Sequence, residues 1–289
     1  MRLKKISSLR TINSVKKMQN ICMKIRLSKN PRIVLVPTMG ALHEGHIALI
    51  KRAKATKAIV IVSIFLNPKQ FNEKKDLLTY PKTFNNDKKK LKSLKVDYLF
   101  APKVKEIYSL GFQTKIAVQD FKNHLCGLSR EGHFDSVATI VLKLFNITMP
   151  HIAVFGEKDL QQLVIIKKMI EDLNLPIKII SHKIIRESDG LAMSSRNVKL
   201  TNKNREIAPI IYKGLKRIKL ISKLKKRASC KNLVKTLRDY YSTNGINNVE
   251  YIEIIDTRTM TYPRIPSKDC HIVVAAKIGN VRLIDNLKF

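Results

Sequence analysis

The sequence has no tryptophan, few other aromatic residues and few acids. Phe and Tyr make up 6% of the 289 residues, and 22 Asp and Glu stand against 56 Lys and Arg. The hydrophobic fraction of 44% is nevertheless ordinary for a globular protein, which argues against intrinsic disorder. The length is sufficient for one large domain or two smaller ones with a substantial core.

Cysteine and long apolar runs are also scarce. The cysteines are widely spaced and form no CxxC pair, which argues against a zinc module or a disulfide scaffold and favours a reducing, cytoplasmic location. They are Cys22, Cys126, Cys230 and Cys270. The longest apolar stretch, Ile59 to Leu66, is too short to cross a bilayer, so we expect no membrane association.

The scarcity of acids leaves a formal net charge of +34 and a pI near 10.2. Such a charge favours a polyanionic partner, and two basic helices expected within 201–240 are where RNA would bind. Aromatic residues that could stack on bases are few there, namely Tyr212 and Tyr240. Because Lys, Ile and Asn all have AT-rich codons, genomic bias is a sufficient explanation of the charge. We expect no nucleic-acid partner.

The N-terminal segment 1–27 is basic and contains no acid. It resembles a mitochondrial presequence in composition. The alternative is a short strand and an exposed helix that lead into the first core strand. We favour the alternative because only about 30 residues precede that strand.

Short β-branched runs alternate with helix-like segments, which is typical of a parallel α/β sheet. Strands are expected at 33–36, 58–66, 96–101, 151–155 and 177–180. Helices are expected at 44–54 and 81–94, after a loop within 133–146, and at 159–173. The pattern predicts a Rossmann-like nucleotide-binding domain over residues 1–184.

After about residue 184 the pattern changes. Two basic helices within 201–240 precede expected strands at 248–255, 271–277 and 281–284, with a turn at 278–280. Residues 185–289 are therefore predicted to form a smaller α+β domain.

The first core strand is followed by PTMGALHEGH at 37–46. In an open α/β sheet, ligands bind beyond the carboxyl ends of the strands, near helix N-termini that attract anions. Gly40 and Gly45 allow the backbone to approach a ligand closely. His43 and His46 share one face of a starting helix, so both can donate to phosphate oxygens. This is the HxGH pattern of adenylyl-transferring α/β enzymes, and no Walker A loop occurs.

Two further segments carry polar side chains suited to a nucleotide. In GEKDLQQ at 156–162, Lys158 can neutralise phosphate, while Asp159 can cap a helix or hold ribose or Mg²⁺. In DGLAMSSRN at 189–197, two hydroxyls and an arginine can close over a triphosphate. An ordinary capped helix and a polar linker are the respective alternatives. Neither Ser194 nor Ser195 belongs to a convincing triad.

The second core strand ends in SIFLNPKQF at 63–71, which brings Asn67 and Gln70 near the same sheet edge. This segment alone is equally compatible with a strand and a turn. Asp87 and Asp97 are as readily explained as surface or capping residues as catalytic ones.

Taken together, these segments resemble the pantothenate synthetase (pantoate–β-alanine ligase) family. The matching words are PTMGALHEGH at 37–46, SIF-NP-QF at 63–71, GHF at 132–134, KLFN at 143–146, FGEKD-QQL at 155–163, DGLAMSSRN at 189–197 and RLIDN at 282–286. The resemblance spans nearly the whole chain, and it leaves no room for a cleaved targeting extension.

The resemblance implies a cytoplasmic ligase of pantothenate and coenzyme A biosynthesis that acts in two steps. Pantoate attacks the α-phosphorus of Mg²⁺-ATP to give pantoyl adenylate, and the β-alanine amine then displaces AMP. Such chemistry requires alignment and charge stabilisation more than a protein nucleophile. The resemblance also implies a homodimer. The runner-up is another HxGH adenylyl- or cytidylyltransferase, which would lack the two substrate glutamines.

The resemblance assigns roles by position. His46, as proton donor, and His43 are the implied catalytic residues, and Gln70 and Gln162 bind pantoate, with Gln70 also facing β-alanine. The implied ATP-binding residues are Met39, Gly40, Ala41, Leu42, His43, Glu44, Gly45, His46, Gly156, Glu157, Lys158, Asp159, Ile185, Met193, Ser194, Ser195 and Arg196. Metal ligands are not assigned.

Four residues depart from the family pattern. They are Lys82 in place of Arg, Glu131 in place of Pro, Ser136 in place of Gly and His151 in place of Asp. Ser136 tests whether its position requires a positive φ, and Lys82 lacks a planar bidentate donor.

Overall fold

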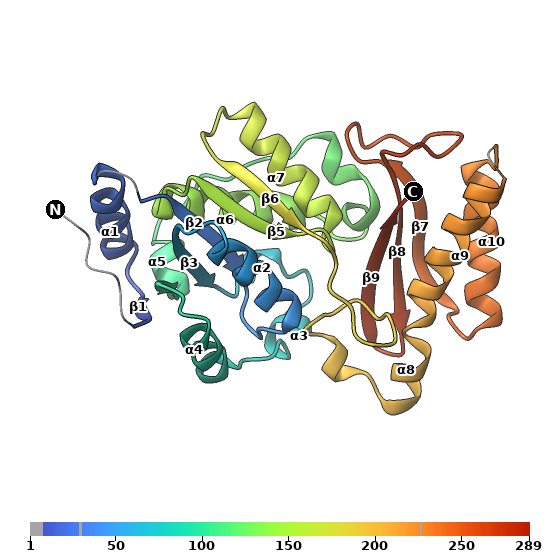
Figure 1. Cartoon of the computed structure of the whole chain (residues 1–289), viewed down its shortest axis with the longest axis horizontal. Coiled ribbons are helices and arrows are strands. Elements are labelled where there is room, and N and C mark those ends of the chain that lie inside the picture. The colour runs from blue at the N-terminus through green and yellow to red at the C-terminus, as the bar shows by residue number, and fades with distance from the viewer. Residues whose placement is uncertain (1–7, 29–30, 226) are drawn as a thin grey trace.

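The computed structural model describes residues 8–28, 31–225 and 227–289, which form two lobes that lie side by side (Figure 1). The first lobe is built on a six-stranded sheet in the order β1-β4-β3-β2-β5-β6, in which every pair is parallel. The second lobe is built on an antiparallel sheet in the order β7-β8-β9. The predicted fold class, a Rossmann-like parallel sheet followed by a smaller α+β unit, is confirmed.

The first lobe contains the following elements. Its strands are β1 (Arg10–Ile12), β2 (Ile33–Thr38), β3 (Ile59–Ile64), β4 (Tyr98–Phe100), β5 (Ile152–Gly156) and β6 (Lys178–His182). Its α-helices are α1 (Val15–Leu27), α2 (Glu44–Lys54), α3 (Lys74–Leu78), α4 (Phe84–Ser93), α5 (Val104–Ile107), α6 (His133–Thr148) and α7 (Leu160–Asp172). Short 3-10 helices are η1 (Pro68–Gln70), η2 (Asp120–Asn123) and η3 (Leu125–Gly127).

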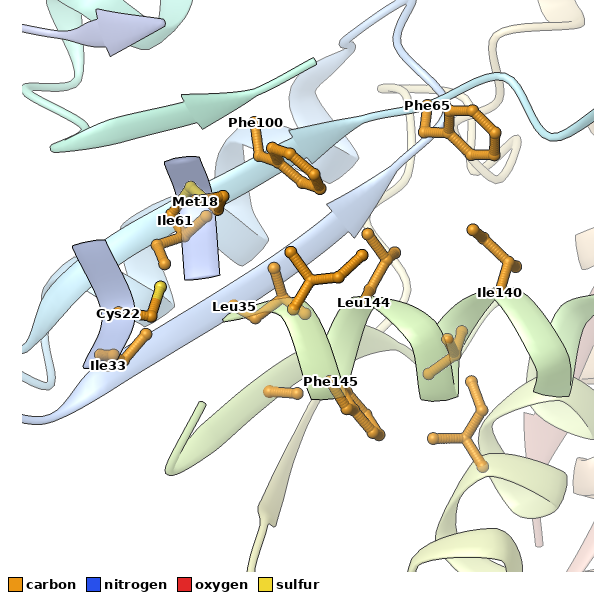
Figure 2. Packing of buried hydrophobic residues seen from close by; sticks show 14 of the residues in the cluster. Met18, Cys22, Ile33, Leu35, Ile61, Phe65, Phe100, Ile140, Leu144 and Phe145 are labelled. Carbon is orange, nitrogen blue, oxygen red and sulfur yellow. The ribbon is translucent and has the colours of Figure 1, made fainter. Parts of the chain in front are cut away.

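The central strands are apolar on both sides because helices cover both faces of the sheet. On one face, Leu35 of β2 and Ile61 of β3 belong to one buried cluster with Leu144 and Phe145 of α6 (Figure 2). On the other face, alternate strand residues such as Val34 pack against α2 and α4. Because both faces are packed against helices, the core holds the ends of these strands in fixed positions.

Helix α1 is not the exposed helix that the sequence suggested. Met18, Cys22 and Ile25 recur at helical spacing, and all three are buried in the main core. Ser14 caps the helix by accepting a hydrogen bond from the Lys17 N–H. The expected short strand is confirmed as β1, whereas residues 1–7 of this segment lie outside the described residues.

Helix α6 also departs from expectation, because it begins at His133 without a preceding loop inside 133–146. Gly132 stands before it with φ +68°, a conformation that glycine adopts without strain. The GHF word is thus the helix start itself.

Among its described residues, the second lobe has three α-helices in the basic segment, where two were expected. They are α8 (Asn202–Ile207), α9 (Ile210–Leu224) and α10 (Cys230–Thr243), preceded by the 3-10 helix η4 (Asn197–Lys199). Pro209 separates α8 from α9, because a proline fits at the beginning of a helix but not inside one. Helices α9 and α10 pack on the sheet of β7 (Asn248–Asp256), β8 (Cys270–Ile278) and β9 (Val281–Lys288).

The expected domain boundary near residue 184 falls in the segment between β6 and α8 that joins the two sheets. All four cysteines are free and buried. Within the described ranges, no helix is both long and apolar enough to span a membrane.

The packing of α6 generates a stability prediction. Phe145 is 2% exposed and belongs to the same buried cluster, so Phe145→Ala should lower the free energy of unfolding by about 3–5 kcal/mol. The control is Leu224→Ala at a 75% exposed position, which should change it by less than about 0.5 kcal/mol. Urea denaturation measures both, and equal effects would contradict the assignment of the core.

Candidate active site

The site lies where the direction of strand order reverses. β2 is paired with β3 on one side and with β5 on the other. The chain leaves β2 through α2 on one face of the sheet, and leaves β5 through α7 on the opposite face. In open α/β sheets the crevice between two such carboxyl ends is the usual place for a ligand.

The segment after β2 makes a sharp turn that a buried carboxylate holds. Gly40 and Ala41 both have positive φ angles, +84° and +51°. The Ala41 and Leu42 N–H groups each donate to one oxygen of Asp87, both at 2.9 Å. Asp87 is 1% exposed and also accepts from the Thr83 hydroxyl. Charge-assisted hydrogen bonds of this kind fix the strained turn from α4.

The two histidines then begin α2 in a fixed orientation. His43 Nδ1 accepts from the Gly45 N–H at 3.1 Å, and His46 Nδ1 accepts from the His43 N–H at 3.4 Å. Both protons therefore reside on Nε2, the nitrogen left to donate to a ligand. The rings lie 4.1 Å apart. A Cβ on Gly45 would come within 2.8 Å of the His43 ring, so glycine is required there.

Both histidines are neutral at physiological pH. Burial, with the Lys158 charge next in importance, lowers the pKa of His43 to about 4. Burial and the neighbouring His43 lower the pKa of His46 to about 3. The pair thus presents two neutral N–H donors.

A second side of the site comes from the turn between β5 and α7. Asp159 occupies the N-cap position of α7, but its carboxylate caps no described backbone N–H, so this carboxylate stays open to the cleft. Burial by itself would raise the pKa of Asp159, yet Lys158 and Arg196 together lower it. The turn therefore offers one ammonium group and one ionised carboxylate.

The loop at 189–197 closes the site from the second lobe. Arg196 donates to Asp76 of α3 at 2.7 Å, and Ser195 donates to the Tyr80 hydroxyl at 3.2 Å. The Arg196 N–H donates to the Ser194 hydroxyl at 3.2 Å. These bonds bring two hydroxyls and a guanidinium over the crevice.

The glutamines lie on the side of the site toward α6. Gln70 is 8% exposed; its amide nitrogen donates to Met39 Sδ, and its oxygen accepts from Asn67 at 3.2 Å. Gln162 faces the cavity, whereas its neighbour Gln161 is buried and bonds the backbone at Cys126. Two polar amides thus enter an otherwise apolar wall of the cavity.

The cavity has a volume of about 210 Å³ and brings most of the predicted residues together. Those that line it are Met39, His43, Gly45, His46, Gln70, Gly156, Lys158, Asp159, Gln162, Ile185, Met193, Ser194, Ser195 and Arg196. Those that do not are Gly40, Ala41, Leu42, Glu44 and Glu157. Leu42 is buried in the core, Glu44 is exposed, and the Glu157 carboxylate accepts from Ser181.

A larger cleft of about 890 Å³ separates the lobes. It shares with the smaller cavity the residues Lys158, Asp159, Gln162, Ser194 and Arg196. The histidine pair and Gln70 line only the smaller cavity, which is therefore the candidate chemical centre.

Sequence reasoning missed several residues of the site. The sequence around Asp87 favours no role over another, and Tyr80 follows a short helix with no motif. Arg130 and His133 brace Gln70: His133 Nδ1 donates to the Gln70 carbonyl at 2.8 Å, and Arg130 donates to the same oxygen. The GHF word hinted at His133, but not at its partner.

The departures from the family pattern are accommodated. Ser136 lies inside α6 and needs no positive φ, which Gly132 adopts instead. His151 Nδ1 accepts from the Ile33 N–H at 3.1 Å, as a carboxylate oxygen could. Lys82 is exposed, and the Glu131 carbonyl accepts from Asn72.

The fold and the histidine pair define an α/β enzyme of the HxGH nucleotide-binding class. The family model for pantoate-beta-alanine ligase matches residues 10–288, and the chain belongs to this family. A pantothenate synthetase of Thermodesulfovibrio yellowstonii is 45% identical over 271 residues, which are 93% of this chain and 96% of the relative.

Solved structures agree. The pantothenate synthetase of Thermus thermophilus superposes with a TM-score of 0.89 at 34% identity, over 96% of this chain and 99% of that one. A pantoate-beta-alanine ligase of Francisella tularensis, in complex with beta-gamma ATP and beta-alanine, has a TM-score of 0.80 and 38% identity, covering 97% and 98%.

The role of Asp87 leads to one prediction. Asp87→Asn keeps the shape but turns an amide N–H toward a backbone N–H, so the turn before His43 should loosen and the Kd for ATP should rise at least about tenfold, or about 1.4 kcal/mol. Calorimetric titration measures this. The matched control is Asp97→Asn at the opposite end of the sheet, where Asp97 accepts from the Val60 N–H at 2.9 Å. Equal weakening in both variants would contradict a local role.

The buried histidines lead to a pH prediction. Burial lowers the pKa of His133 and His271, like that of His43, to about 4. Each then binds its proton in the unfolded chain first, near pH 6.5, so the stability that it contributes is complete above pH 6.5 and is lost as the pH falls toward 4. The urea midpoint should fall over this window.

The size of the effect can be tested at one position. His46→Gln keeps an acceptor for the His43 N–H but cannot titrate. It should therefore reduce the slope of the free energy of unfolding against pH by about 1.4 kcal/mol per pH unit at most. A midpoint that stays constant or rises between pH 6.5 and 5 would contradict the burial of these rings.

Proposed function

We propose that this chain joins pantoate to β-alanine at the expense of ATP, forming pantothenate, AMP and diphosphate through pantoyl adenylate. The single observation that carries the proposal is the union, in one cavity, of the His43 and His46 donors, the Lys158 and Arg196 cations, and the Gln70 amide. Family membership supports the same reaction.

In the first step, a pantoate carboxylate oxygen bonds to the α-phosphorus and the bond to diphosphate breaks. Negative charge grows on the leaving oxygens, and the Nε2–H groups of His43 and His46 are free to donate to them. Lys158 neutralises the remaining charge. His46, as a neutral imidazole, acts mainly as a donor, and full proton transfer is not required.

In the second step, the neutral amine of β-alanine bonds to the acyl carbon, AMP departs with its bonding electron pair, and the proton that the amine nitrogen loses passes to solvent. The glutamines serve this step by orientation. Asn67 and Met39 bond the Gln70 side-chain amide, while Arg130 and His133 hold its backbone carbonyl, so the amide is placed before substrate binds. Pre-organised amides place the carboxylate without a cost in side-chain entropy.

We propose that Mg²⁺ enters as part of the ATP substrate. The described ranges contain no group of three or more His, Cys, Asp or Glu side chains that could hold a metal. Mg²⁺ commonly binds substrate phosphates with one or two carboxylates, and Asp159 is the carboxylate that lines the smaller cavity within these ranges. The family resemblance supports the expected homodimer. The four free cysteines support the expected cytoplasmic location.

The decisive test is stoichiometry. Purified protein with ATP, pantoate and β-alanine should release one AMP for each pantothenate formed, and omission of pantoate should abolish AMP release. Coupled measurement of AMP and mass-spectrometric quantification of pantothenate check this. AMP-free formation of a nucleotide-linked product would instead indicate another HxGH nucleotidyltransferase.

The control is His46→Ala, measured in a single turnover. Loss of a donor to the leaving diphosphate should slow pantoyl adenylate formation by about 10²–10³-fold while pantoate binding stays within about threefold. An unchanged adenylation rate would remove His46 from the mechanism.

A further inference from the structure

The RLIDN word at 282–286 matches the family, but the reaction just described does not use it. It lies on β9 of the second lobe, and its Asp285 and Asn286 are 4% and 5% exposed. Buried polar side chains need partners, and both side chains of this pair find partners outside their own sheet.

Asn286 reaches the turn between β5 and α7 of the first lobe. This turn carries Lys158 and is termed the phosphate turn. Its amide nitrogen donates to the Glu157 carbonyl at 2.9 Å and to the Lys158 carbonyl at 3.2 Å. Two successive carbonyls held by one amide fix both peptide planes of the turn, because each peptide is planar. The orientation of the backbone that carries Lys158 thus depends on a side chain from the other lobe.

Asp285 reaches the other site segment. Arg186 donates two hydrogen bonds to its carboxylate, at 2.6 and 2.9 Å, and a further one to the Gly190 carbonyl at 3.0 Å. The Arg186 guanidinium also lies over the Tyr212 ring, 3.5 Å from its centre. The loop that carries Ser194 to Arg196 is therefore anchored next to the phosphate turn. The Asn286 N–H donates to Asp285 at 2.7 Å and links the two anchors.

We propose that Asn286 is a positioning residue for the adenylation step, which sets Lys158 against the 189–197 loop with Asp285 as its fixed neighbour. The proposal rests on the proposed function for its kinetic readout. Its physical basis is that the amide of Asn286 bonds atoms of the phosphate turn, and that neighbouring residues of one strand hold the two walls that face the triphosphate.

The test is Asn286→Asp, which keeps the shape but replaces the donating amide by a carboxylate that repels both carbonyls. Pantoyl adenylate formation should slow by about 100-fold, as expected when a phosphate ligand shifts by about 1 Å. The reaction of β-alanine with added pantoyl adenylate, which carries no β- or γ-phosphate, should stay within about threefold. Asn286→Ala, which removes the donors without adding a charge, should give the same pattern.

A double-mutant cycle assigns the effect to Lys158. In a Lys158→Met background, Asn286→Asp should slow adenylation further by less than about threefold, because its effect acts through Lys158. The matched control is Asn247→Asp, the same charge change at an exposed residue just before β7, which should leave both half-reactions unchanged.

Three results would overturn the proposal. The first is an equal decrease in both half-reactions of Asn286→Asp, which indicates a structural role only. The second is full additivity of Asn286→Asp with Lys158→Met, and the third is an unchanged adenylation rate. ATP binding provides a readout independent of ligation: the Kd should rise about tenfold in Asn286→Asp. If the native chain bound ATP but formed no pantothenate, the proposed function would fail, and weaker ATP binding by the variant would still uphold the positioning role.

Discussion

The pairing of β2 with both β3 and β5 is the constraint on which the site depends. Because β2 is central and buried on both faces, its carboxyl end cannot move relative to that of β5 without breaking the core. The turn with His43 and the turn with Lys158 are consequently held at one edge. Rigid strands that end together provide the precision that adenylyl transfer requires.

Buried polar side chains then aim the loops that leave these strands. Asp87 holds the turn after β2, Asn67 holds Gln70, and Asn286 holds the turn after β5. Each is at most 5% exposed, so its hydrogen bonds are shielded from water and an unpaired partner would be costly. The groups that contact substrate are few, and groups behind them determine where they point.

Charge is used locally in this chain despite its excess of basic residues. The positive groups at the cavity are Lys158, Lys183 and Arg196, and Arg196 is paired with Asp76. Burial keeps His43 and His46 neutral among them. Two neutral donors and a small number of cations can stabilise a growing anion without holding the substrate too tightly.

The parallel α/β fold, the smaller second lobe and about half of the residues that line the cavity follow from the sequence alone, because β-branched runs and local words such as the histidine pair encode them directly. The sequence did not determine that α1 is part of the core, that α6 starts at once, or that Asp87, Tyr80 and Asn286 act on the site. Those side chains are distant in sequence from what they hold, 129 positions for Asn286 and Glu157. These contacts depend on the folded chain, because a buried hydrogen bond between distant segments leaves no local periodicity or motif.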